Sequence, residues 1–252
     1  MKIILSPAKK MKIRQDEPFL ADRPEFLEEA KYLRGLLKEK TPEELKNLWQ
    51  CNDKIAQENL QRLRELDLEH NRTLALLAYE GIQYQYMAPQ VFTETQWQYA
   101  RKHVRILSGL YGVLNPTDGV IPYRLEMQAK LENREGKDLY AFWGNQLYES
   151  LAKEEDLILN LASKEYSRAV EKYQDGRVKI LTCIFGELVQ GKVKVKATQA
   201  KMARGEMVRW LAEKQIEEPG EIRGFSHLGY QFSEKRSTET EYVFIKQKIQ
   251  LI

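Results

Sequence analysis

The sequence predicts an α/β or α+β fold in which a mixed sheet and helices form a single intertwined domain over residues 1–252. Short apolar segments of strand length alternate with longer segments whose apolar residues repeat at helical spacing. No repeat, low-complexity tract or linker divides the 252 residues. Hydrophobic residues make up 42% of the chain, enough for a sizeable core. Within this domain we expect residues 24–66 to form a helical subdomain.

The chain opens with KIILS, which predicts a short buried strand ending at Ser6. A helix is expected over residues 24–40, with Pro24 in its first turn. Its apolar positions repeat at helical spacing and are Phe26, Ala30, Leu33 and Leu37.

Two further short helices follow, joined by Gln50, Cys51 and Asn52. The first begins in a capping box built by Thr41 and Glu44, and the second is capped by Asn52 or Asp53. This layout is typical either of a helix-hairpin-helix element, whose backbone amides contact DNA phosphate, or of a plain αα-hairpin. Lys46 and Lys54 flank the turn and are candidate phosphate contacts. The glycines usual in such a hairpin are absent, and QCN stands in their place.

The remaining elements alternate between strands and helices. An apolar run at 73–87 turns at Gly81, and helices are expected at 93–104, 139–154, 164–173 (capped by Ser163) and 200–216. Strands are expected at 104–108 and 156–163, with one hairpin formed by 177–185 and 191–198 around GELVQ and another within 228–247.

Three of the predicted strands end in serine: Ser6, Ser108 and Ser163. If the strands are parallel neighbours, these ends lie side by side, where open α/β sheets bind ligands. Serine hydroxyls and helix N-termini there can donate to anions, although serine is also common as an ordinary capping residue. Basic or aromatic residues follow each end: Lys9 and Lys10, Tyr111, then Lys164 and Tyr166.

The segment LSGLYGVLNPTDGVIPYRLEM, residues 107–127, combines glycines and prolines with polar side chains. Tyr123, Arg124 and Glu126 are candidates for acid–base chemistry, although an Arg–Glu pair this close in sequence is also common as a structural pair. The early loop adds four candidate phosphate contacts, or a solvated charged surface, in Lys9, Lys10, Lys12 and Arg14.

A second basic region lies late in the chain. Alternation places Lys192, Lys194 and Lys196 on one face of a strand, and Lys201 and Arg204 share a face of the following helix. These residues could form one wall of a groove for a phosphate backbone, or the lysines could protect an edge strand from aggregation.

Composition and residue spacing argue against several classes of protein and of functional site. The net charge is +3, so a basic surface requires local segregation of charge. The two cysteines and three histidines do not have metal-ligand spacing, and we expect no metal, no cofactor and no disulfide scaffold. The N-terminus is not a signal peptide and no run reaches transmembrane length, so we expect a cytoplasmic protein that is not bound to a membrane. No serine lies in a nucleophile elbow.

Six motifs together resemble the bacterial YaaA peroxide-stress family over nearly the whole chain. They are ILSPAK, the 107–127 segment, GKDLYAFWG, LILNLASKEY, KATQAKMARGEMVRW and GFSHLGYQF. The resemblance implies a cytosolic protein of the hydrogen peroxide response that limits unincorporated iron and binds DNA by structure more than by sequence. It also implies a helix-hairpin-helix element and a positively charged cleft. Because metal-ligand clusters are absent, we expect any effect on iron to be indirect.

Matching the family motifs carries further positions onto this chain, among them Arg105. The DNA- or anion-binding residues that we expect are Ser6, Lys9, Lys54, Arg105, Ser108, Tyr111, Tyr123, Arg124, Glu126, Ser163, Tyr166, Lys196, Lys201 and Arg204. The alternative hypothesis is an enzyme that acts on a nucleotide or nucleobase. It requires a deep pocket that brings Lys9, Arg124 and Glu126 together around a group with a perturbed pKa. The sequence leaves the oligomeric state open.

Overall fold

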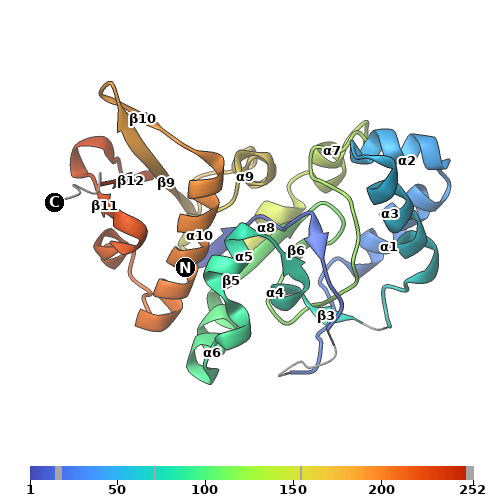
Figure 1. The fold of residues 1–252 in the computed structure, drawn as a ribbon, viewed down its shortest axis with the longest axis horizontal. Helices are drawn as coiled ribbons and strands as arrows, with labels where there is room; N and C mark the ends of the chain where they lie inside the picture. The colour runs from blue at the N-terminus through green and yellow to red at the C-terminus, as the bar shows by residue number, and fades with distance from the viewer. Residues whose placement is uncertain (15–18, 71, 154, 248–252) are drawn as a thin grey trace.

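The structure is a computed structural model that describes residues 1–14, 19–70, 72–153 and 155–247. It has mixed α/β architecture, as predicted, with one large sheet (Figure 1). The strands of that sheet are β1 (Lys2–Leu5), β5 (Val104–Ser108), β6 (Gly112–Leu114), β8 (Leu157–Asn160), β9 (Lys179–Val189), β10 (Lys192–Lys194), β11 (Tyr230–Phe232) and β12 (Glu241–Lys246). Two small sheets pair β2 (Lys10–Met11) with β4 (Tyr79–Glu80) and β3 (Thr73–Leu74) with β7 (Gly119–Val120).

Helices cover the sheet and extend beyond one end of it. In chain order the α-helices are α1 (Leu27–Lys38), α2 (Pro42–Trp49), α3 (Asp53–Glu65), α4 (Ala75–Ala78), α5 (Ile82–Met87), α6 (Glu94–His103), α7 (Leu139–Trp143), α8 (Gln146–Ala152), α9 (Lys164–Glu171) and α10 (Ala197–Lys214). Within the described ranges, each helix is too short or too polar to cross a lipid bilayer.

The strand order of the large sheet is β11-β12-β9-β8-β1-β5-β6, with β10 paired to β9. The five central strands, from β12 to β5, run parallel to one another, whereas β6, β10 and β11 are antiparallel to their partners. Strand β1 therefore lies between β8 and β5, with Ile4 paired to Asn160 on one side and to Arg105 on the other. The strand ends at Ser6, Ser108 and Ser163 therefore lie side by side at the carboxyl ends of these parallel strands.

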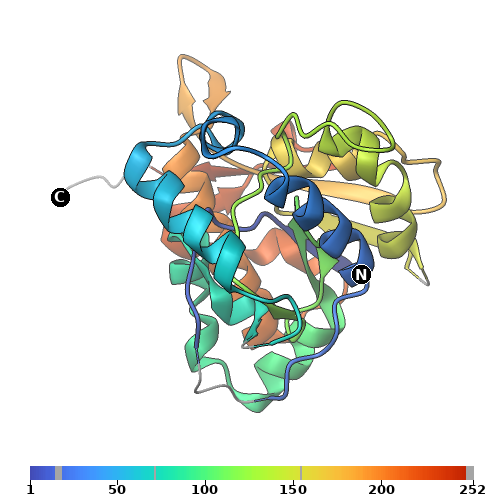
Figure 2. The same ribbon diagram turned by 90° about the vertical axis from the view of Figure 1, so that its right-hand side faces the viewer.

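The chain changes direction across this sheet between β1 and β8. The connection from β1 to β5 moves toward one edge, whereas the connection from β8 to β9 through α9 moves toward the other. Because such crossovers are right-handed, α6 of the first connection and α9 of the second lie on opposite faces of the sheet, and α6 packs on β1 and β5. Figure 2 shows α5, α6 and α10 apart from α8 and α9. A reversal of this kind opens a crevice at the carboxyl ends of the strands.

Helices α1 to α3 form the helical region expected for residues 24–66. The capping box at Thr41 and Glu44 is present, and Asn52 accepts a hydrogen bond from the Ile55 amide at the start of α3. The turn between α2 and α3 begins with Gln50 in the left-handed conformation, with φ of 45°. Arg34 of α1 donates to the backbone oxygens of Leu63 and Leu66, which ties α3 to α1.

Some element boundaries differ from the predictions. Helix α1 starts at Leu27, so Pro24 precedes it, although the four predicted apolar positions are buried. Strand β9 continues through GELV to Val189, which places the turn of its hairpin at Gln190 and Gly191. Strand β10 ends at Lys194, and Lys196 instead precedes α10.

The segment expected to be helical over residues 139–154 is interrupted. Helices α7 and α8 are separated by Gly144, whose φ of 49° is left-handed, and residue 154 lies outside the described ranges. The second hairpin is confirmed, because β11 pairs antiparallel with β12.

Candidate functional site

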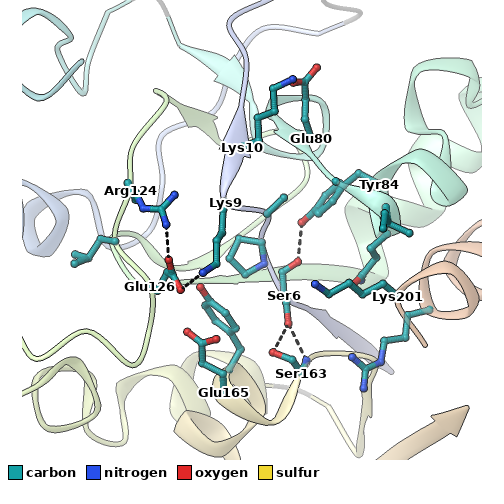
Figure 3. A pocket seen from close by; sticks show the side chains of 18 of the residues that line it. Ser6, Lys9, Lys10, Glu80, Tyr84, Arg124, Glu126, Ser163, Glu165 and Lys201 are labelled. Atoms are coloured by element: carbon teal, nitrogen blue, oxygen red, sulfur yellow. Dashed lines mark hydrogen bonds and ion pairs between the residues drawn. The ribbon is translucent and has the colours of Figure 1, made fainter. Parts of the chain in front are cut away.

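A cavity of about 420 Å³ lies at the carboxyl ends of β1 and β8, where the direction of the chain reverses. We call it the central cavity. Figure 3 shows that its labelled side chains come from several parts of the chain: residues 6–10 after β1, then β4, α5, the segment after β7, the start of α9, and α10. Its lining residues are Ser6, Pro7, Ala8, Lys9, Lys10, Glu80, Gly81, Ile82, Gln83, Tyr84, Tyr123, Arg124, Leu125, Glu126, Ser163, Glu165, Tyr166, Lys201 and Arg204.

Two of the serine strand ends contact each other at this cavity. Ser6 Oγ donates to Ser163 Oγ over 3.1 Å and accepts from the Ser163 amide over 2.7 Å. Ser163 occupies the N-cap position of α9 as predicted, but its side chain makes no capping hydrogen bond. Its hydroxyl is instead engaged by Ser6, so the pair links the end of β1 to the start of α9 (Figure 3).

A second cluster joins the two sides of the cavity mouth. Lys9 Nζ lies 2.7 Å from Glu126 Oε2, and Arg124 Nη2 lies 3.2 Å from Glu126 Oε1 (Figure 3). Arg124 also donates through Nε and Nη2 to the backbone oxygen of Trp49, at the end of α2. The guanidinium therefore connects the α2–α3 hairpin to the cavity wall.

The segment around Arg124 depends on a close backbone approach at Gly109. A Cβ atom at this position would lie 2.4 Å from the backbone oxygen of Leu125. Only glycine permits this contact.

Beneath the segment, the Tyr123 hydroxyl lies 2.6 Å from Ser108 Oγ and 2.8 Å from the Tyr79 hydroxyl. Burial raises the pKa of Tyr123 to about 12, so this network is neutral.

Glu165 provides a second carboxylate in the cavity. Burial raises its pKa, and the negative charge of Glu126 acts in the same direction. The amide of Gln128 donates to Glu165 Oε1 over 3.4 Å. The ionised form of such a group only accepts hydrogen bonds, whereas its protonated form can also donate one.

The opposite wall is formed by α5 and α10. A Cβ atom at Gly205 would lie 2.0 Å from the backbone oxygen of Gln83, so this glycine permits α10 to pack closely on α5. The packing brings Lys201 and Arg204 to the cavity. Within the described ranges, Gln83 Nε2 and Arg204 Nε are buried and have no hydrogen-bond partner.

Two open hollows adjoin the central cavity. The hairpin hollow, of about 530 Å³, shares Glu126 with it and is lined by Lys40, Glu44, Asn47, Leu48, Trp49, Gln50, Glu126, Gln128, Ala129 and Lys130. The β2 hollow, of about 430 Å³, shares Lys10, Glu80 and Tyr84 among others and is lined by Lys10, Lys12, Arg14, Leu76, Leu77, Tyr79, Glu80, Gly81, Ile82, Tyr84, Gln85, Pro89 and Gln90. The three spaces are therefore neighbours that share lining residues.

The structure brings most of the expected site residues to the central cavity. Those that line it are Ser6, Lys9, Tyr123, Arg124, Glu126, Ser163, Tyr166, Lys201 and Arg204. Ser108 and Tyr111 lie behind its wall, since Ser108 is buried against the Tyr123 hydroxyl and the Tyr111 ring packs edge-on against Tyr123.

Three expected residues lie elsewhere. Arg105 is at the start of β5, at the opposite end from Ser108, and donates to the backbone oxygens of Arg101 and Val104. Lys54 lies exposed at the start of α3 and lines none of the three spaces. Lys196 pairs with Glu187 across the β9–β10 hairpin at 2.6 Å.

Four polar residues of the cavity lining were not predicted as site residues from the sequence: Glu80, Gln83, Tyr84 and Glu165. Glu165 lies two residues after Ser163 in the motif LILNLASKEY, and this position close to a predicted site residue could have indicated it. The other three come from the segment 73–87, in which only the turn at Gly81 was predicted. Among the described residues, no group of three or more His, Cys, Asp or Glu side chains is arranged to hold a metal ion.

Comparison with known proteins places the chain in a family. The sequence profile described as "Peroxide stress protein YaaA" matches residues 1–236. A "UPF0246 protein" of Agathobacter rectalis is 50% identical over 244 residues, covering 97% of this chain and 98% of the relative. Another, from Lactiplantibacillus plantarum, is 49% identical over 247 residues and covers 98% and 100%. A third, from Pediococcus pentosaceus, is 48% identical and covers 99% of each chain. The chain therefore belongs to the YaaA family of peroxide stress proteins.

Proposed function

We propose that this peroxide stress protein binds DNA through backbone contacts along the hairpin hollow, the central cavity and the β2 hollow. The observation that carries the proposal is the series of basic side chains that line these three neighbouring spaces. Across them, basic residues outnumber carboxylates, although the net charge of the chain is only +3. The basic residues are Lys9, Lys10, Lys12, Arg14, Lys40, Arg124, Lys130, Lys201 and Arg204.

The α2–α3 hairpin supports the same proposal. The first amides of a helix have no partner within it, and here Asn52 caps the Ile55 amide, which leaves those of Asp53 and Lys54 for a phosphate. Lys46 pairs with Asp53 at 2.6 Å, which offsets an acidic charge that would repel DNA. Arg124 holds the end of α2 through the Trp49 oxygen, so hairpin and cavity present one surface.

The salt dependence of binding tests this proposal. Each phosphate neutralised by a cation contributes about 0.9 to the slope of log affinity against log salt. We expect the triple variant Lys9→Gln, Lys54→Gln, Lys201→Gln to bind duplex DNA more weakly. Its slope should be shallower by roughly 2 to 3, measured by fluorescence anisotropy from low to moderate salt.

A matched triple variant provides the control. Lys179, Lys214 and Lys235 are exposed, line none of the three spaces and lie outside the α2–α3 hairpin that contains Lys54, and changing them to glutamine removes the same charge. We expect this control to retain most of the wild-type slope. Equal slopes in the two triple variants would overturn the assignment of the surface, and absence of DNA binding at low salt would overturn the function itself.

A second candidate function is supported by the enclosed form of the central cavity. Lys9, Arg124 and Glu126 are in contact there, and burial raises the pKa of the neighbouring Glu165. We propose, as the alternative, an enzyme that acts on a nucleotide or nucleobase, with Glu165 as the proton donor. Incubation with nucleosides, nucleotides and DNA, followed by mass spectrometry of the products, tests it. We expect turnover by wild type and a loss of about a hundredfold or more in Glu165→Gln.

We also propose that the protein lowers unincorporated iron during peroxide stress, as a member of this family. We expect the effect to arise without a dedicated iron site. Iron titration of the purified protein checks this, because a stoichiometric high-affinity complex would contradict an indirect route.

A further inference from the structure

We propose that the central cavity receives a single nucleobase, extruded from a DNA strand that lies along the two adjoining hollows. The phosphate of that nucleotide would remain at the cavity mouth. The inference rests on the proposed DNA binding and goes further, because it states what the enclosed part of the site holds. It requires a charged rim, an apolar interior with hydrogen-bonding groups, and a size suited to one nucleotide.

Arg124 and Glu126 of the lining are only 9% and 15% exposed, and the exposed charges of the lining are three lysines at its rim. The side chains of Lys9 and Lys10 are 64% and 80% exposed, and Lys201 is exposed on α10. The aromatic residues of the lining are covered, since Tyr84 is 4% and Tyr166 6% exposed. Phosphates are attracted to the exposed lysines, whereas bases stack on aromatic rings. The cavity therefore offers a nucleotide the two environments that its two ends require.

Two buried polar groups in the lining lack partners. Gln83 is 6% exposed, and neither its Nε2 nor Arg204 Nε has a hydrogen-bond acceptor among the described residues. A buried donor left unpaired costs free energy, so a ligand that supplies acceptors gains affinity. Purine and pyrimidine edges carry such acceptors on ring nitrogens and carbonyl oxygens. A carboxyl at Glu165 adds a group able to accept from, or donate to, the same edge.

The dimensions favour one nucleotide over a duplex. The volume of about 420 Å³ falls within the range of roughly 300 to 1,000 Å³ that is typical of small-ligand sites. The cavity adjoins the hairpin hollow at Glu126 and the β2 hollow at Glu80, since each residue lines both spaces. A strand can therefore pass along both hollows while one base turns inward. Extrusion costs least where the base is already unpaired.

Duplexes that contain one unpaired nucleotide test the inference. One series carries each of the four bases in a single-nucleotide bulge, and its partner carries an abasic nucleotide in the same bulge, which preserves the backbone distortion and removes the base. By fluorescence anisotropy, we expect wild type to bind at least one base-containing bulge about tenfold more tightly than the abasic bulge. Equal affinity for all five bulges would overturn the inference while leaving DNA binding intact. Failure to bind any duplex at low salt would overturn the proposed DNA binding itself.

Three variants connect the preference to the cavity. Gln83→Leu removes the unpaired amide, and Ala8→Leu narrows the cavity. Gln98→Leu, at an exposed position of α6, replaces glutamine by leucine outside the cavity and serves as the control. Melting temperatures establish that each variant folds. We expect the two cavity variants to lose more affinity for the base-containing bulge than for the abasic bulge, so that most of the preference for a base disappears. Retention of the full preference in both folded variants would overturn the inference.

A free nucleotide offers the same chemistry as an extruded base, so a further measurement separates the two sources. Deoxynucleoside monophosphates are added to wild type and to Gln83→Leu, and the melting temperatures are compared. Stabilisation of wild type alone, combined with equal affinity for base and abasic bulges, would show that the cavity takes a free nucleotide and that the extruded base is wrong. Competition of deoxynucleoside monophosphates with the base-containing bulge, but not with the abasic bulge, supports the inference.

Discussion

Asp118 shows at the scale of one residue how burial changes a carboxylate. It is 1% exposed and accepts hydrogen bonds from the amide of Asn115 over 2.8 Å and from its Nδ2 over 3.4 Å. Burial nevertheless raises its pKa to about 6, because the two hydrogen bonds do not replace the water that a charged carboxylate loses. The neighbouring charge of Asp22 acts in the same direction.

This pKa predicts a dependence of stability on pH. The folded pKa of about 6 lies above the unfolded value of about 3.9, so the folded chain binds more protons between these values. The contribution of Asp118 to the free energy of unfolding therefore decreases as pH rises from 4 to 7, by about 2 kcal/mol. Asn115 still finds an acceptor in Asp118→Asn, which does not titrate.

Urea unfolding of the two proteins at several pH values checks this expectation. Wild type should lose stability relative to Asp118→Asn as pH rises through this window. The comparison cancels other titrating groups, such as Glu165, that both proteins share. Parallel stability curves would contradict the assignment of a raised pKa to Asp118.

The prediction of individual site residues succeeded where chemistry and chain direction agreed. Ser6 and Ser163 meet because the strands preceding them are parallel and adjacent. Arg105 shows the opposite case, since it lies three positions before Ser108 and thus near the far end of β5. Gln83 could not be predicted as a site residue. It stands out because its buried Nε2 has no hydrogen-bond acceptor among the described residues, and this burial depends on the packing of α5 against α10.

At the scale of elements, the contact between α5 and α10 determines the shape of one cavity wall. Gly205 of α10 faces the backbone of α5, whereas Gly35 of α1 has no atom within 4 Å of an added Cβ. The same substitution at the two glycines should therefore have opposite effects. Both lie within helices, where alanine is intrinsically favoured by about 1 kcal/mol.

We expect Gly35→Ala to raise the free energy of unfolding by about 0.5 to 1 kcal/mol. Gly205→Ala should lower it by about 2 kcal/mol or more, because the added methyl group would lie 2.0 Å from the Gln83 oxygen and force the helices apart. Thermal and urea denaturation measure both changes. A stabilising effect of Gly205→Ala would show that the two helices separate easily.

The elements themselves were predicted with uneven success, and the reason is physical. The capping box at Thr41 and Glu44 and the N-cap at Asn52 are local signals, and they located the starts of α2 and α3 closely; the helix predicted over residues 93–104 also agrees closely with α6. The segment 73–87 instead forms short pieces, β3, α4, β4 and α5, which are held by pairing with β7 and β2. Such pairing depends on residues distant in sequence, so a local pattern cannot indicate it.

At the scale of the whole molecule, burial is unequal between the sheet and the helical end. Ile3, Ile4 and Leu5 of β1 are fully covered, and β8 beside it is buried throughout. The hairpin of α2 and α3 projects from the other end of the molecule and buries few residues: Leu45, Trp49, Ala56 and Asn59 (Figure 1). Local opening is favoured where few apolar contacts must be broken.

Hydrogen exchange should reflect this inequality. We expect the amides of α2 and α3 to exchange with deuterium well before those of β1 and β8, as measured by mass spectrometry of peptides. Exchange from the sheet should approach the rate set by global unfolding. Simultaneous exchange of the hairpin and the sheet would mean that the molecule opens only as one unit.

The position of β1 between β5 and β8 has a consequence for biosynthesis. The first strand to leave the ribosome occupies the middle of the sheet and must wait for partners that begin at residues 104 and 157. The last wall of the cavity, at Lys201 and Arg204, emerges later still. Contacts between such distant parts of a chain slow folding. The site therefore forms only after synthesis has passed Arg204, well after β1 has been made.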